Sequence, residues 1–303
     1  MRFDKKSLTS LIVIFAVVLS LVMVKVLNGD VADKPADNKV PANDGRLTVH
    51  FLDVGQGDSE FIELPNGQCM LIDASVSSYG DKITQAIQGY GYSEIDYLVA
   101  THPHADHIGG MSDIIESFEI GDIYIPKAVS TSKTYENLLT VISDKGLEIN
   151  TAKADKTIYS DSEMQIDILA PVSESYDETN NYSAVVKITY GSDSFLFTGD
   201  AEEYSENEML DYCYDKLSAD VLKVGHHGSS SSTGDDFLNA VNPQYAVISC
   251  GVGNSYGHPH SETISRLNDM GIDYYRTDIN GTVTISCDGN GTFNTECENE
   301  LDN

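Results

Sequence analysis

A short segment, THPHADHIGG at residues 101–110, holds three of the chain's eight histidines and one aspartate, at His102, His104, Asp106 and His107. The segment follows an apolar, strand-like run, so these side chains are expected in a loop, where their close spacing lets them converge. Zinc, manganese and iron all accept imidazole and carboxylate ligands. The segment therefore predicts a metal site. A purely structural site is the alternative, but loop sites of this ligand type usually keep a coordination position open to water.

The composition limits which substrates the chain can bind by charge alone. Acidic residues number 48 against 18 basic ones, giving a formal charge of -30, and the only adjacent basic pair is Lys5 and Lys6. Tight non-specific binding to duplex DNA is therefore not expected, because nothing neutralises a phosphate backbone. An anionic substrate would need a local positive centre, which a divalent metal ion supplies.

The N-terminus has the pattern of a membrane-targeting segment. Basic residues precede an apolar run, and residues 1–27 are predicted to be an uncleaved signal-anchor or a cleaved signal peptide. Residues 28–45 are polar and rich in Asp, Asn and Pro, as in a solvated linker. Either form would place the rest of the chain outside the cytoplasm, on the extracellular face of the membrane or secreted. Contact with the membrane is expected through the N-terminal segment only.

The remaining chain alternates strand-like and helix-like runs, which indicates an α/β fold. Residues 46–290 are expected to form one layered domain in which helices cover a sandwich of two sheets. A variable middle region, residues 123–161, is expected to carry a single helix near residues 135–143. Residues 291–303 are assigned to an acidic tail.

The His-x-His-x-Asp-His pattern after a strand resembles the signature motif of the metallo-β-lactamase fold, a four-layer αββα sandwich. The resemblance extends to other strand ends: Asp73 ends QCMLID, Asp200 ends SFLFTGD, and His226 and His227 follow VLKVG. It implies that His102 and His104 bind one metal ion. The second ion would be bound by Asp106, His107 and His226, with His227 as the alternative to His226. Asp200 would bridge the two ions and Asp73 would orient a ligand histidine.

The sequence departs from this family pattern at one position. The family usually has a further histidine between the main motif and the bridging aspartate, but no histidine occurs between His107 and His226. At the expected place stands TNNYSAVV, where Asn181 or Ser183 could offer an oxygen, directly or through water. One or two divalent ions, zinc or manganese, are therefore expected.

Six motifs narrow the resemblance to the extracellular domain of competence proteins of the ComEC type. In order, they are FLDVGQGDS, THPHADHIGG, NNYSAVV, TGD, KVGHHGSSSST and YGHPHSETISRL. Proteins of that type are multi-spanning channels, whereas this sequence has a single apolar segment. The chain is therefore expected to be a free-standing relative that does not import DNA by itself.

Residues within these motifs have further chemical interpretations. Glycines in DVGQGD allow a tight turn that brings Gln56 and Asp58 toward the site, although a simple β-turn is the alternative. His258, in GHPH, is a candidate proton donor to a leaving group, because imidazole titrates near neutral pH; a capping or packing role is the alternative. The serine-rich loop after His227 could hold phosphate oxygens at the start of a helix, or could simply be flexible.

The resemblance implies a metal-dependent hydrolase that attacks with a metal-bound hydroxide, Asp106 and His258 being the candidate catalytic residues. A phosphodiesterase or nuclease is favoured, with a phosphodiester or other anionic substrate and DNA as one candidate. One alternative is a non-catalytic, metal-stabilised module that binds a surface polymer or a partner. Another is a hydrolase of a different ester or of lactams.

Overall fold

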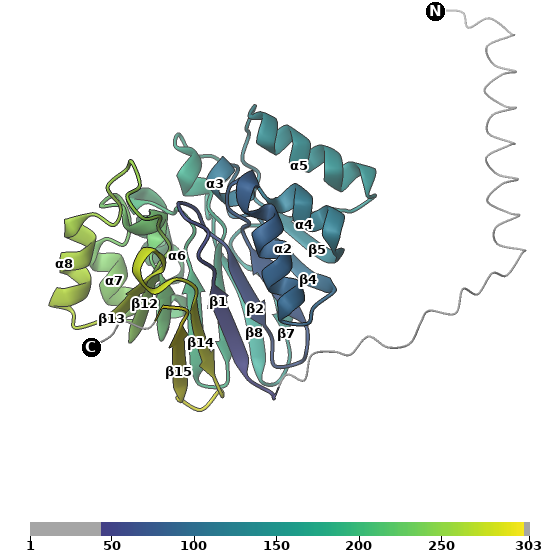
Figure 1. Cartoon of the computed structure of the whole chain (residues 1–303). Coiled ribbons are helices and arrows are strands. Elements are labelled where there is room, and N and C mark those ends of the chain that lie inside the picture. The colour runs from purple at the N-terminus through teal and green to yellow at the C-terminus, as the bar shows by residue number, and fades with distance from the viewer. Residues whose placement is uncertain (1–43, 300–303) are drawn as a thin grey trace, which may run out of the picture. The chain divides into compact units, whose positions relative to one another are not determined.

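The computed structural model describes residues 44–299, which fold into two β-sheets packed face to face, with helices on both outer sides (Figure 1). The N-terminal segment predicted at residues 1–27, most of the predicted linker and residues 300–303 lie outside the described residues. Within residues 44–299, no helix has the length and hydropathy that crossing a membrane requires.

The first sheet has eight strands, of which the first three along the chain are antiparallel and the next three run parallel to the third. In spatial order they are β15 (Phe293–Cys297), β14 (Val283–Cys287), β1 (Leu47–Phe51), β2 (Glu60–Glu63), β3 (Cys69–Ile72), β4 (Glu94–Val99), β5 (Glu119–Ile125) and β6 (Ile149–Thr151).

The second sheet has seven strands and repeats this change from antiparallel to parallel pairing. In spatial order they are β13 (Asp273–Arg276), β12 (Tyr245–Ile248), β11 (Val221–Lys223), β10 (Asp193–Phe197), β9 (Val185–Tyr190), β8 (Met164–Ala170) and β7 (Lys156–Ser160). Each half of the domain therefore joins antiparallel strands to strand-helix units.

The helices are divided between the two outer faces (Figure 1). The first sheet is covered by α2 (Gly80–Gly89), α3 (Ala105–Ile108), α4 (Met111–Ser117) and α5 (Lys133–Asp144). The second is covered by α6 (Glu203–Leu217), α7 (Asp235–Val241) and α8 (Ser261–Asp269). Short helical turns are η1 (Ser77–Tyr79), η2 (Thr179–Tyr182), η3 (Gly225–Gly228) and α9 (Thr277–Asn280).

Side-chain alternation along the strands explains the layering. In β3, Met70 and Ile72 belong to the core between the sheets, whereas Cys69 and Leu71 pack under the helices of the first sheet. A strand whose two faces are both buried needs apolar residues at every position, because successive side chains point to opposite faces. The predicted α/β, four-layer αββα sandwich is confirmed.

Some elements were not predicted from the sequence. The middle region contains β6 and β7 in addition to the expected helix, which is α5. These strands are short and largely polar, so they lack the apolar alternation that marks a strand. Residues assigned to an acidic tail include β15, which pairs antiparallel with β14 at the sheet edge. Its side chains alternate between half-buried and exposed, as an edge strand allows.

One edge of the sandwich collects the carboxyl ends of strands from both sheets. In the first sheet, β4, β5 and β6 are parallel and end together. In the second sheet, β8 runs antiparallel to β9 and β9 antiparallel to β10, so β8 ends at the same edge as β10 and β11. Loops leaving these ends meet, and the histidine-rich segment is one of them.

Candidate metal centre

The histidine-rich segment follows β4 and turns directly into α3. Its backbone is tied to two neighbouring loops: the Asp58 amide donates to the Asp106 carbonyl at 3.1 Å, and the Ala74 amide donates to the His107 carbonyl at 2.7 Å. A Cβ atom at Gly57 would lie 2.6 Å from the Asp106 carbonyl oxygen, which is closer than atoms can approach. Only glycine at position 57 therefore allows the DVGQGD turn to pack against the backbone of Asp106.

Four histidines surround the carboxylate of Asp200, which follows β10. The Nε2 atoms of His102, His107, His226 and His227 lie 3.7, 3.2, 3.6 and 3.7 Å from its oxygens. His107 and His227 are nearest to Oδ1, whereas His102 and His226 are nearest to Oδ2. The carboxylate therefore has two distinct sides, each facing a pair of imidazoles.

The other ring nitrogen of each histidine is held by an oxygen. Nδ1 of His107 lies 2.6 Å from Asp73, and Nδ1 of His226 lies 3.3 Å from Glu202. Nδ1 of His227 lies 3.0 Å from the Ser249 carbonyl oxygen. An N–H that donates at Nδ1 leaves the lone pair at Nε2, so these contacts orient the metal-binding nitrogen toward Asp200.

His102 is held in a similar way by two hydroxyl groups. Its Nδ1 lies 3.2 Å from Thr101 Oγ1 and 3.4 Å from Ser183 Oγ. Its Nε2 lies 3.0 Å from Nδ1 of His104, whose side chain is exposed. His104 therefore approaches the cluster from the solvent side.

His226 and His227 are consecutive but reach different sides of Asp200. Both have left-handed backbone conformations, with φ of 48° and 54°. Such a conformation costs non-glycine residues about 1–3 kcal/mol each, and persists only where surrounding contacts enforce it. The turn leaves His227 fully buried and His226 with a side chain that is 24% exposed.

The donor set fits a divalent metal ion. Among residues 44–299, Nε2 of His107, Nε2 of His227 and Oδ1 of Asp200 are buried without a hydrogen-bond partner. Four groups of side chains offer ligand atoms that all lie within 4.8 Å of one another. Two of them reach the pocket or its floor: His102 with His107 and Asp200, and Asp106 with His107 and His227. The other two contain Asp58, one with Asp73 and His107 and one with Asp200 and His227. Buried polar atoms of this kind are costly unless something binds them, and a cation at their centre would do so.

Charge within the cluster shifts the titration of its members. Burial opposes charge on His107 and His227, but Asp200 and other nearby carboxylates raise the pKa of His107 well above its usual value and that of His227 to about 10. Burial likewise opposes charge on Asp200, but His107 and His227 lower its pKa well below the usual value. Without a metal ion these two rings therefore hold a second proton at neutral pH. A bound cation would displace that proton from Nε2, because a ligand nitrogen must be unprotonated.

Asp58 lies behind the cluster, where it contacts His227 at 3.2 Å and Lys223 at 2.8 Å. Burial would raise the pKa of Asp58, but Lys223 and His227 lower it to about 2. Asp58 is therefore ionised and orients the His227 ring by contacting its Nδ1. Its side chain is not part of the pocket lining.

The cluster opens into a pocket of about 350 Å³, and Asp106 and His104 lie at its wall. Gln56 and His258 also line it, and each has a buried nitrogen without a hydrogen-bond partner in the described part of the chain, Nε2 and Nδ1 respectively. Burial and the neighbouring His227 lower the pKa of His258 to about 4. The ring is therefore neutral at neutral pH, and the role of His258 toward a leaving group stays a prediction.

Two residues predicted as oxygen ligands have other contacts. The Asn181 side-chain oxygen accepts from the backbone amides of Glu202 and Ser205, at the start of α6. The Ser183 hydroxyl accepts from the Asp200 amide at 3.1 Å. Both residues therefore support the loop that carries Asp200.

The serine-rich loop is not arranged to hold phosphate. The amides of Thr233 and Gly234, at the start of α7, donate to the carboxylate of Glu206. A buried carboxylate therefore occupies the position that the sequence suggested for an anion.

Several residues at the site were not predicted from the sequence. Lys223 contacts Asp58, and Glu202 contacts His226. The pocket is also lined by Tyr256 and Asn180. Lys223 lies in an apolar strand, where a buried lysine is rare unless paired, and that rarity is the one signal the sequence offered.

Comparisons with known proteins agree with this geometry. The family model described as the metallo-beta-lactamase superfamily matches residues 52–252. ComE operon protein 3 of Bacillus subtilis is 31% identical over 252 residues, covering 78% of this chain and 32% of that protein. Competence protein ComA of Neisseria gonorrhoeae is 28% identical, covering 86% and 34%. The chain thus spans about a third of the length of these curated relatives.

A solved structure shares the fold. CmlA, a diiron β-hydroxylase from Streptomyces venezuelae, superimposes with a TM-score of 0.51 at 15% identity, covering 76% of this chain and 52% of that chain. At this identity the likeness concerns the fold alone.

Proposed function

Because the chain belongs to the metallo-β-lactamase superfamily, we propose that it is a metal-dependent phosphodiesterase that cleaves nucleic acid outside the cytoplasm. The observation that carries the proposal is the convergence of four imidazole Nε2 atoms on the two oxygens of Asp200. The competence-protein relatives favour a nucleic-acid substrate.

The two sides of Asp200 suggest how two ions would be shared. His102, His104 and His226 would hold one ion with Oδ2, and Asp106, His107 and His227 would hold the other with Oδ1. In this assignment His226 supplies the ligand that the family pattern places earlier in the sequence. Imidazole and carboxylate ligands suit zinc or manganese. Ions held here would acidify a bound water and neutralise charge on the phosphoryl oxygens.

The remaining pocket residues would position the substrate. Gln56 Nε2–H can donate to a non-bridging phosphate oxygen, because its Oε1 is already engaged with the Gly251 amide. His258 is neutral at pH 7, so it would donate an N–H hydrogen bond to the leaving group. Its backbone is fixed by Asn254, which accepts from the His258 amide and donates to its carbonyl.

The test measures hydrolysis of bis-p-nitrophenyl phosphate and of single-stranded DNA by metal-loaded protein, with Mn²⁺ or Zn²⁺. Asp106→Asn should abolish both activities. Asp81→Asn should leave both unchanged, because this exposed aspartate at the start of α2 lies away from the cluster.

Two outcomes would contradict the proposal. Bound metal without turnover of any substrate would favour the binding-module alternative. Hydrolysis of thioesters or lactams but not of phosphodiesters would favour the other hydrolase classes.

A further inference from the structure

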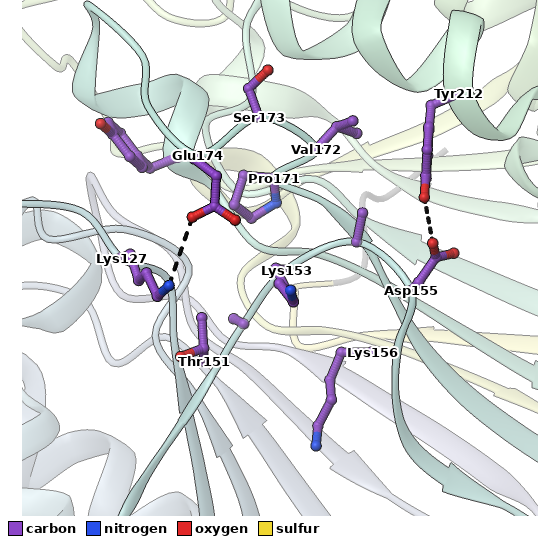
Figure 2. A pocket seen from close by; sticks show the side chains of 13 residues that line it. Lys127, Thr151, Lys153, Asp155, Lys156, Pro171, Val172, Ser173, Glu174 and Tyr212 are labelled. Atoms are coloured by element: carbon purple, nitrogen blue, oxygen red, sulfur yellow. Dashed lines mark hydrogen bonds and ion pairs between the residues drawn. The ribbon is translucent and has the colours of Figure 1, made fainter.

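We propose that a second, lysine-lined pocket beside the metal centre binds the backbone phosphates of single-stranded DNA on one side of the bond to be cut. This inference rests on the proposed phosphodiesterase function. The pocket has a volume of about 440 Å³ and lies among the loops that follow β5, β6 and β8 (Figure 2). A pocket of this size accommodates a small organic group and is separate from the metal pocket.

The pocket lies on the same edge of the sandwich as the metal centre. The metal ligands follow β4 and β10, and this pocket is formed after β6 and β8, which are two positions further along each sheet. With strands about 4.8 Å apart, the offset is about 10 Å. The turn η2 separates the two pockets, because Asn180 lines the metal pocket and Tyr182 lines this one. A linear polymer across the metal centre would continue into this pocket.

Positive charge is scarce in the chain but concentrated here. Of 18 lysines and arginines, six precede residue 44, which leaves 12 in residues 44–299. Three of these 12, Lys127, Lys153 and Lys156, line the pocket. Two carboxylates, Asp155 and Glu174, also line the pocket, so its formal charge is slightly positive in a protein with a formal charge of -30.

Carboxylates at the pocket are already engaged. Lys127 lies 3.6 Å from Glu174, and Asp155 contacts Lys216 and the Tyr212 hydroxyl. Figure 2 shows these two carboxylates on opposite sides of Lys153. Within residues 44–299, neither Lys153 nor Lys156 has a carboxylate within ion-pair distance, although Lys156 lies 5.8 Å from the centre of the Tyr124 ring. Two ammonium groups therefore remain available for an anion.

Aromatic side chains at the same pocket favour single-stranded nucleic acid over other polyanions. Tyr212 is 52% exposed and Tyr182 is half-buried, and both line the pocket. Lysines that track a backbone, beside aromatic rings on which bases stack, are the combination that single-strand binding uses.

A binding experiment tests the pocket independently of catalysis. The probe is a fluorescein-labelled, phosphorothioate oligothymidylate of about 12 nucleotides, a length within the range of single-strand sites, titrated with metal-loaded protein. Lys153→Gln/Lys156→Gln should raise Kd about tenfold and reduce the slope of log K against log salt by about 0.7 for each lost contact. The matched control Lys133→Gln/Lys145→Gln removes two exposed charges on and beside α5 and should have little effect. Equal effects of the two double variants would overturn the proposal.

Hydrolysis separates this proposal from the function on which it rests. Lys153→Gln/Lys156→Gln should raise KM for an unmodified oligonucleotide by a similar factor and leave hydrolysis of bis-p-nitrophenyl phosphate unchanged, because the small substrate does not reach the pocket. Normal turnover of both substrates by the double variant would overturn the proposal that the pocket binds DNA. The proposed phosphodiesterase function would be unaffected. No turnover by wild type would overturn the phosphodiesterase, while the binding experiment would still decide whether the pocket holds single-stranded DNA.

Discussion

Lys223 and Asp58 form an ion pair inside the protein, with 2.8 Å between Nζ and Oδ2 and only 1% of each side chain exposed. The pair joins β11 of the second sheet to the DVGQGD turn of the first, and Asp58 in turn contacts His227. A buried charge is tolerated here because its partner is present.

Removing one member of this pair should destabilise the protein strongly. Lys223→Met leaves Asp58 buried without its cation, and the free energy of unfolding should fall by about 3–5 kcal/mol, measured by urea denaturation. Adding Asp58→Asn to this variant should recover part of the loss, because no unpaired charge then remains. A double variant less stable than Lys223→Met would contradict this interpretation.

Asp73 should control metal affinity although it does not face the pocket. Asp73→Asn weakens the acceptor for His107 Nδ1, and metal affinity should fall about 10–100-fold in a competition assay with a chromogenic chelator. The control Asp96→Asn changes an aspartate of the same sheet that contacts Gln68 and the Cys69 amide. Equal affinity in wild type and Asp73→Asn would argue against His107 as a ligand.

The consecutive histidines His226 and His227 should bind different metal ions. His102→Ala/His226→Ala should retain about one metal ion per chain, as should His107→Ala/His227→Ala, because each variant removes ligands on one side of Asp200. His226→Ala/His227→Ala should lose both ions. Metal content measured by inductively coupled plasma mass spectrometry checks this. A full ion remaining in the last variant would mean that one histidine of the pair is not a ligand.

Glu206 should make stability depend on pH. Burial raises its pKa to about 7, although the backbone amides of Gly234 and Thr233 favour the ionised form. Since the folded value exceeds the unfolded value of about 4.3, the folded state holds the proton more tightly. Stability should therefore fall as pH rises from about 4.3 to 7, by at most about 4 kcal/mol.

Glu206→Gln should flatten this part of the pH profile, as measured by urea denaturation between pH 5 and 8. The exposed neighbour on α6 provides the control, Glu203→Gln, which should keep the wild-type profile. Parallel profiles for wild type and Glu206→Gln would show that Glu206 is ionised throughout this range.

The sequence predicted the fold and the ligand types because both depend on local pattern. Asp73 and Asp200 follow the apolar strands β3 and β10, so their positions at the sandwich edge follow from the order of strands. The apolar sequence pattern that marks a strand is strong wherever both faces of the strand are buried. It fails for β6 and β7, which are short and polar, and for the edge strand β15.

The roles of particular site residues depended on backbone geometry that composition does not encode. Two adjacent histidines would normally point to opposite sides, and only the left-handed turn at His226 and His227 brings both to Asp200. The neutral state of His258 likewise follows from burial and nearby imidazoles. The pairing of Lys223 with Asp58 spans 165 residues, which no local pattern reveals.

The placement of Asp200 on one sheet and His107 on the other has a consequence for folding. Metal ions shared between them would act as cross-links between the two halves of the chain, so that neither half alone could assemble the binding site. Such coupling stabilises the folded state by about 4 kcal/mol when free metal exceeds its dissociation constant a thousandfold. Translation of the second half, which supplies Asp200 and the tandem histidines, would then be the step at which the chain first becomes able to retain its metal.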